Sequence, residues 1–234
     1  MNRLLITVLI KAFHETFPNA EIAGCEFHWK SCLTSKIDNV GLKNLYSENI
    51  EFILLVRYIW ALAFVPLDKV VSVWETVIQE KVREGCLNWE VLEKDMGTKI
   101  GRFLKYVDIT WIGELNARTK IRKRPLYPHT LWNKFEATLN GDKKTNNLCE
   151  GYNHAFGLSL PAKATDWTVM DRFRTEDATT KTVLHQAAMG NNRDEDNRVQ
   201  KRRSREEKFK SLVGNYENVS IKAYMESIVT FFEK

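Results

Sequence analysis

Apolar residues recur at helical spacing through the first half of the chain, and strand patterns are thin throughout. The clearest stretch predicts a helix over about Lys43–Val65, stopped by Pro66. A second helix is expected from an N-cap at Asp68 to a C-cap at Gly85, and a third over about Trp89–Tyr106. Three helices with short connections predict a compact helical subdomain.

The rest of the chain also favours a mainly α fold. Pro18 ends a first helix, because the residue before a proline is pushed out of helical conformation. The 234 residues include 11 Gly and 5 Pro, too few for a turn-dense all-β protein. The further predicted elements are helices over about Leu4–Phe17, Thr145–Phe156, Trp167–Met189 and Ser220–Phe232, and a short extended piece at Glu21–Cys25.

The composition indicates a soluble, intracellular globular protein. Hydrophobic residues make up 44% of the chain and charged residues 28%, a balance typical of folded domains. Four cysteines in a chain of this length do not make a disulfide framework, so reduced thiols are expected. The longest apolar stretch, Phe52–Leu67, contains Arg57 and is too short to span a bilayer, so no membrane partner is expected.

Two segments concentrate positive charge and predict contacts with phosphate. Residues 118–124 hold five cations and no acid, and residues 198–210 hold seven cations against two glutamates. Such clusters bind nucleic-acid backbones by releasing counterions, without sequence preference, and both resemble nuclear-import patches. The alternative interpretation is a solvated loop and a solvated helix face. The candidate nucleic-acid-binding residues are Arg118, Lys120, Arg122, Lys123, Arg124, Lys201, Arg202, Arg203 and Arg205.

Cys25 and His28 stand three positions apart, close enough to share one metal ion. A structural zinc site needs four ligands, and the comparable second pair is Cys149 with His154. A composite Zn²⁺ site from these two pairs is one hypothesis. The other is that Cys25 is a small buried apolar residue and His28 a helix-start residue.

The segment Thr145-Asn146-Asn147-Leu148-Cys149-Glu150 also has two interpretations. Asn147 followed three residues later by Glu150 has the spacing of a capping box at a helix start. In the functional interpretation, Glu150 projects from the first helical turn as a metal-binding carboxylate. One carboxylate does not hold a pair of Mg²⁺ ions, because such sites need several converging oxygen ligands.

Several blocks of the chain, taken in order, resemble the transposases of Mutator-like elements (MULEs). The match spans about residues 12–157, and its specific parts are the Cys-x-x-His and Thr-Asn-Asn-x-x-Glu blocks. The blocks that carry the resemblance are Phe17-Pro18-Asn19-Ala20, Gly24-Cys25-Glu26-Phe27-His28, Leu62-Ala63-Phe64-Val65-Pro66, Thr110-Trp111-Ile112-Gly113, Leu131-Trp132-Asn133 and Thr145-Asn146-Asn147-x-x-Glu150-Gly151-Tyr152-Asn153.

The resemblance implies the C-terminal portion of an RNase H-like α/β core with a helical insertion. Residues 1–160 would be a partial transposase domain, with the insertion at about 40–110, and residues 161–234 a helical, basic tail. In such transposases three carboxylates hold two Mg²⁺ or Mn²⁺ ions that drive strand cleavage and transfer. Glu150 corresponds to the third carboxylate, and Cys25 and His28 to the family's Cys-x-x-His.

Two of the three catalytic carboxylates have no counterpart in this sequence. The expected position of the second aspartate holds Leu4, the first would precede Met1, and no acid occurs before Glu15. We therefore expect a transposon-derived, catalytically incomplete DDE-type transposase fragment that binds DNA in the nucleus, with a tendency to form homo-oligomers. The alternatives are an active DNA transposase or nuclease completed by missing N-terminal sequence or a partner chain, and a non-catalytic helical interaction module clipped by zinc.

Overall fold

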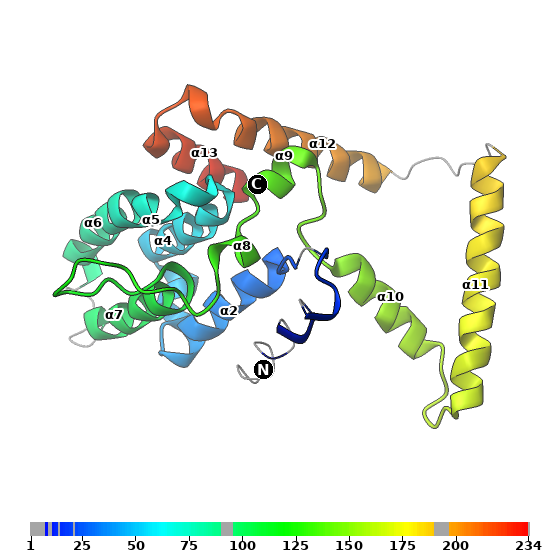
Figure 1. The fold of residues 1–234 in the computed structure, drawn as a ribbon. Helices are drawn as coiled ribbons and strands as arrows, with labels where there is room; N and C mark the ends of the chain where they lie inside the picture. Colours follow the sequence, from blue (N-terminus) through cyan, green and yellow to red (C-terminus); the bar gives the residue numbers. More distant parts are fainter. Residues whose placement is uncertain are drawn as a thin grey trace. The chain divides into compact units, whose positions relative to one another are not determined.

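The computed structural model describes residues 8, 11–13, 15–20, 22–89, 96–189 and 197–233, and its regular elements are all helical (Figure 1). Pairing of extended chain within these ranges amounts to one isolated antiparallel bridge between Leu115 and Arg122. The expected mainly α fold is confirmed. The expected extended piece is not a strand: residues 22–25 are irregular, and the Gly24 N–H donates to the Leu131 carbonyl at 2.7 Å.

Many of the helices follow one another with short connections, and a long loop joins η4 to α8 (Figure 1). The α-helices are α2 (Glu26–Asn39), α3 (Lys43–Glu48), α4 (Ile50–Ala61), α5 (Val70–Val73), α6 (Gln79–Trp89), α7 (Met96–Val107), α8 (His129–Trp132), α9 (Phe135–Asn140), α10 (Asn147–Leu158), α11 (Asp166–Ala188), α12 (Asn197–Gly214) and α13 (Ile221–Glu233). Tighter 3₁₀ turns are η1 (Leu62–Phe64), η2 (Leu67–Lys69) and η5 (Tyr216–Asn218), and wider π turns are η3 (Trp74–Ile78) and η4 (Asp108–Ile112).

The chain divides into two compact units. Unit 1 comprises residues 1–144 and 209–234, and unit 2 comprises residues 145–208. The division passes through α12, whose last turns belong to unit 1. In the described part of the chain, no helix combines the length and apolar character needed to cross a bilayer.

The core of unit 1 forms around α4. Four large apolar side chains of this helix, Phe52, Leu55, Val56 and Ile59, are at most 2% exposed. Each such burial contributes about 1.5–3 kcal/mol. The C-terminal helix α13 packs against α4 and buries Tyr224, Met225, Ile228 and Val229. The C-terminal segment of unit 1 thereby shares one core with the segment that contains α4.

The predicted helix over 43–65 is divided into three pieces. Asn49 interrupts it, because its side-chain Oδ1 accepts the Phe52 N–H at 2.9 Å and caps α4. The chain then tightens into η1 before Pro66. The expected helix end near Pro66 is confirmed, whereas a continuous helix is wrong.

The second predicted helix is longer and less regular than expected. Asp68 is not its N-cap: it lies inside η2, and α5 starts after Lys69 without a side-chain cap. Gly85 is not its C-cap, because α6 continues through Gly85 to Trp89. Helix α2 was expected only as a helix start near His28, and its extent over 26–39 was not predicted, since its apolar residues are sparse. Its buried face consists of Trp29, Leu33 and Ile37.

Unit 2 contains a helical hairpin of α10 and α11. Phe156 of α10 stacks on Phe173 of α11, with ring centroids 4.6 Å apart. Thr165 caps α11, since its hydroxyl oxygen accepts the Thr168 N–H at 3.3 Å. None of the 23 residues of α11 is buried. The predicted helices over 167–189 and 220–232 are confirmed as α11 and α13.

The N-terminal helix prediction over Leu4–Phe17 lies partly outside the described residues. The described residues 8, 11–13, 15 and 16 are helical, and the helix ends before Pro18 as expected. The Phe17 N–H donates to the Phe13 carbonyl at 2.8 Å and closes the last turn.

Candidate nucleic-acid interface

The first basic segment is an exposed loop between η4 and α8, as predicted. Its tip is a tight turn, because the Asn116 side-chain oxygen accepts the backbone N–H groups of Arg118 and Thr119 at 2.9 and 3.0 Å. Lys120 has a φ of +56°, a left-handed conformation that reverses the chain. The Asn116 N–H donates to the Ile121 carbonyl at 3.0 Å and closes the turn. A built turn, rather than a slack loop, therefore presents Arg118 and Lys120 to solvent.

Arg122 anchors this loop to the helices beneath it. Its guanidinium Nε donates to Glu75 at 2.8 Å, and its Nη1 donates to Asp108 at 2.7 Å and to the Gly113 carbonyl. Burial alone would lower the pKa of Arg122, but the two carboxylates reverse this and raise it. The side chain is 15% exposed. The structure gives Arg122 a bracing role that differs from the predicted contact with phosphate.

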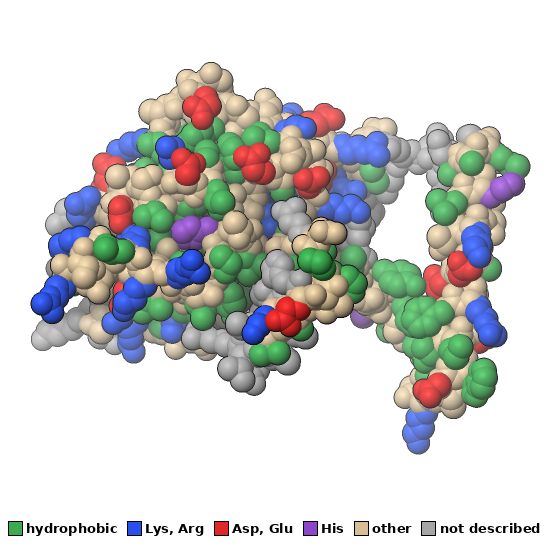
Figure 2. Space-filling view, viewed as in Figure 1, with side chains coloured by type: hydrophobic (Ala, Val, Ile, Leu, Met, Phe, Trp, Pro, Cys, Tyr) green, Lys and Arg blue, Asp and Glu red, His purple; other side chains and the backbone are tan. Residues whose placement is uncertain are grey.

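The other cations of the loop face solvent. Lys123 pairs with Glu114 at 2.9 Å, and this hydrogen bond lowers the pKa of the Glu114 carboxyl. The side chains of Arg118, Lys120 and Arg124 are exposed and have no ion-pair partner among the residues that the structure describes. Figure 2 shows Lys and Arg side chains along the edge of unit 1 formed by the loop between α7 and α8. The loop thus offers three available cations in a stretch of seven residues.

The second basic segment is a helix face. Lys201, Arg202, Arg203 and Arg205 lie in the N-terminal part of α12 and are all exposed. The Arg202–Glu206 pair is loose, with 3.9 Å between Nε and Oε1. Exposed pairs of this kind contribute about 0–1 kcal/mol and do not prevent the cation from meeting a phosphate.

The tryptophan rings near the basic loop belong to the core and offer no surface for stacking bases. Trp29 stacks on Trp132 at 4.9 Å with 7° between the planes, and Trp111 meets Trp29 edge-on at 6.4 Å. All three are at most 5% exposed. Their indole N–H groups have no hydrogen-bond partner in the described part of the chain. These three indole rings are therefore not available for stacking on bases.

Several of the blocks that carry the MULE resemblance contact one another inside unit 1, whereas the block at 145–153 belongs to unit 2. The Asn133 side-chain amide donates to the Val65 carbonyl at 2.8 Å. The Gly24 N–H reaches Leu131, and a Cβ on Gly24 would lie 2.7 Å from the Leu131 carbonyl oxygen. His129, beside that block, donates from Nε2 to the Ile112 carbonyl at 3.0 Å. Within this unit the blocks are packing elements.

The Cys-x-x-His pair lies at the start of α2. Cys25 is the N-cap residue and is half-buried, and His28 is exposed in the first turn. The helix-start interpretation of His28 is therefore confirmed, although Cys25 is less buried than expected. Cys149 and His154 are exposed residues of α10 in the other unit. Across the described residues, no three His, Cys, Asp or Glu side chains lie close enough to hold one metal ion.

Glu150 is a half-buried residue in the first turn of α10, where the helix dipole favours a carboxylate. Helix α10 begins at Asn147, so the predicted capping box with Asn147 as N-cap is wrong. The N-cap is Asn146, next to Thr145, and its side chain makes no capping bond. The resemblance implies two Mg²⁺ or Mn²⁺ ions beside Glu150. The residues there do not fit these ions, since no three acidic side chains of the described chain lie close enough together to bind a metal ion.

Two residues that matter for this surface were not expected. Glu75 and Asp108 brace Arg122, and they lie 47 and 14 positions away in the chain. The available signal was the presence of opposite charges in distant segments. That signal does not reveal which acid pairs with which cation. Comparison with known proteins finds no matching family model, no similar curated protein and no similar solved structure.

Proposed function

We propose that this chain is a transposon-derived protein, related to MULE transposases, that binds DNA through phosphate contacts and performs no strand transfer by itself. The observation that carries the proposal is the braced basic loop: Arg122 holds it from beneath while Arg118, Lys120 and Arg124 face outward. Pre-organised cations contact a phosphate backbone without first losing loop entropy. The RNase H-like origin and the nuclear location remain part of this proposal.

The absence of strand transfer follows from the geometry of Glu150. Two-metal phosphoryl transfer needs ions clamped between several oxygen ligands, and the described residues assemble no such group. The expected result is no Mg²⁺- or Mn²⁺-dependent cleavage of labelled DNA by the purified protein. Cleavage that depends on the metal and is lost in Glu150→Gln would overturn this part of the proposal.

DNA binding is tested by anisotropy of a labelled duplex over a range of salt concentrations. The logarithm of affinity falls with the logarithm of salt by about 0.9 for each neutralised phosphate. Replacing Arg118, Lys120 and Arg124 together by Gln is expected to reduce this slope by about 2–3. The matched control replaces three exposed cations outside both segments by Gln, namely Lys43, Arg102 and Lys163. Equal slopes for the two triple variants would contradict the proposed interface.

A helical interaction module is the second candidate, and helix α11 favours it. Its exposed apolar side chains include Trp167 at 76% and Leu184 at 63% exposure. A 23-residue helix without a buried residue gains little from its own hairpin. Light scattering over a concentration series tests self-association: a dimer weakened by Trp167→Ala would support this candidate, and a monomer at all concentrations would count against it.

A further inference from the structure

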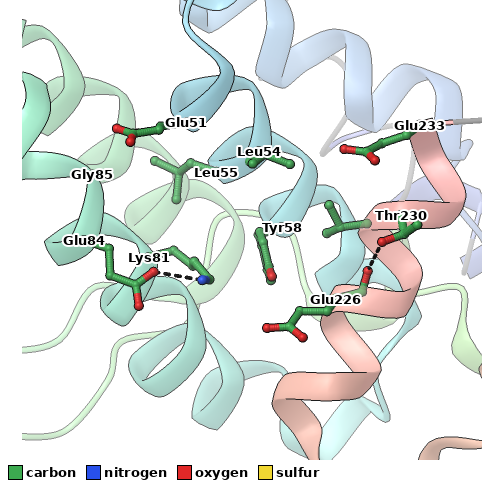
Figure 3. Close-up of a pocket in the computed structure, with 11 residues that line it drawn as sticks. Glu51, Leu54, Leu55, Tyr58, Lys81, Glu84, Gly85, Glu226, Thr230 and Glu233 are labelled. Carbon is green, nitrogen blue, oxygen red and sulfur yellow. Dashed lines mark hydrogen bonds and ion pairs between the residues drawn. The ribbon is translucent and has the colours of Figure 1, made fainter.

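Unit 1 contains a pocket with a cavity volume of about 250 Å³ between α4, α6 and α13 (Figure 3). Part of its wall is apolar and includes Leu55 and Val229, which are at most 4% exposed. A cavity of this size is below the range of drug-sized ligand sites, about 300–1,000 Å³. The pocket therefore has room for one narrow chemical group, such as an unbranched chain.

The pocket carries an excess of negative charge although the whole chain is positive. Each of its three helices contributes glutamates: α4 contributes Glu51, α6 Glu84, and α13 both Glu226 and Glu233. The single cation among the lining residues is Lys81. Lys81 neutralises Glu84 at 2.8 Å, and Arg57 neutralises Glu233 at 2.9 Å from outside the pocket. Glu226 has no ion-pair partner among the described residues, although the charge of Lys222 also reaches Tyr58.

Tyr58 supplies a second, independent feature that points to a ligand. This residue is 5% exposed and lines the pocket, and Figure 3 shows it between Lys81 and Glu226. Its hydroxyl makes no hydrogen bond to any part of the chain that the structure describes. Burial, followed by the charge of Glu226, raises the pKa of Tyr58 to about 12. The hydroxyl therefore stays neutral in a negative field and has a free acceptor oxygen.

Lys81 shows what kind of group this environment accommodates. Its ammonium nitrogen lies 5.4 Å from the centroid of the Tyr58 ring, within the range of a cation–π contact. The apolar walls suit an aliphatic stem, as they do for long lysine side chains in general. A metal ion is disfavoured, because no three acidic side chains of the described chain are close enough to share one.

We propose that this pocket binds a primary alkylammonium group, with the charge between the Glu226 carboxylate and the Tyr58 hydroxyl oxygen and the alkyl stem against Leu55 and Val229. The ammonium donates to both oxygens, which gives each of them the partner it lacks. The same chemistry occurs at the end of a lysine side chain and in free diamines. The site is independent of the basic loop and of the DNA-binding proposal.

The experiment is an NMR titration of the full chain with n-pentylammonium, and n-pentanol is the uncharged probe of equal length. We expect saturable shifts confined to the pocket, and binding of pentanol weaker by at least about tenfold, since it lacks the charge. Glu226→Gln is expected to weaken pentylammonium binding by about tenfold. Glu136→Gln removes the same charge from α9, outside the pocket, and should leave binding unchanged.

Tyr58→Phe provides a second variant that keeps the ring. It removes a hydroxyl without a protein partner, so the fold is expected to survive, and binding should weaken several-fold. Equal binding of Nα-acetyl-lysine amide and pentylammonium identifies a protein side chain as the source, whereas tighter binding of 1,5-diaminopentane identifies a free diamine. Absence of saturable binding, or equal affinities in Glu226→Gln and Glu136→Gln, would overturn the proposal.

Discussion

Arg122 is expected to be the most important cation for the stability of unit 1, although it lies in a surface loop. Arg122→Gln removes three hydrogen bonds. The bond to Glu75 contributes about 0.5 kcal/mol, because that carboxylate is 45% exposed and screened by solvent. The bond to Asp108, which is 23% exposed, contributes about 1–2 kcal/mol, and the Gly113 carbonyl about 1 kcal/mol more. The sum is about 3 kcal/mol.

Urea unfolding, followed by circular dichroism and tryptophan fluorescence, measures this difference. Trp111 lies in η4, the π turn that begins at Asp108, so fluorescence reports on the same region. In a thermal melt, a chain of this size loses about 2–4 °C in Tm for each kcal/mol of lost stability, so Arg122→Gln is expected to lower Tm by about 6–12 °C. Arg118→Gln is the control, since it lies in the same loop and is exposed. Comparable losses in the two variants would refute the bracing role of Arg122.

Three further predictions concern the loop and the core. Gly113→Ala should cost about 2–4 kcal/mol in urea unfolding, because Gly113 has a φ of +107° and a Cβ would lie 2.2 Å from the Lys123 carbonyl oxygen; Gly101→Ala, inside α7 with open space for a Cβ, should instead stabilise the protein by up to about 1 kcal/mol. Burial lowers the pKa of His129, so the unfolded state binds a proton first and the free energy of unfolding should fall from pH 7 to pH 5. His129→Gln should flatten that dependence, and an unchanged profile would contradict it. Tyr224→Phe should cost about 1–2 kcal/mol, because the buried Tyr224 hydroxyl donates to the Phe64 carbonyl; a thermal melt equal to that of the unmodified protein would exclude this.

Local sequence patterns anticipated the long helices but not their interruptions. Helices α11 and α13 were expected to within one residue at each end, because their ends carry local signals. The break at Asn49 was not expected, because the apolar residues around Asn49 favour one continuous helix. In the structure the Asn49 side chain instead caps a new helix. The extent of helix α2 was not predicted, because its three core residues are too few to give a clear helical pattern. Their burial depends on tertiary contacts such as the stacking of Trp132 on Trp29.

The candidate interface was predicted in part for a similar reason. Counting charges identified the basic loop and the basic part of α12, and both are exposed as expected. The count did not separate Arg122, which is engaged beneath the loop, from Arg118 and Lys120 at its tip. Pairing of that kind depends on tertiary distances. The acidic pocket was missed because its glutamates come from three helices far apart in sequence.

Both carboxylates that hold Arg122 lie in π turns, Glu75 in η3 and Asp108 in η4. A π turn takes up one residue more than an α turn, so each shifts the phase of the residues after it by roughly 100°. Removing a single residue from η3 would let the backbone continue as an uninterrupted α-helix. The face of α6 that carries Lys81 and Glu84 would then turn away from Tyr58. A variant that lacks one residue there is expected to keep its helices and lose the pocket.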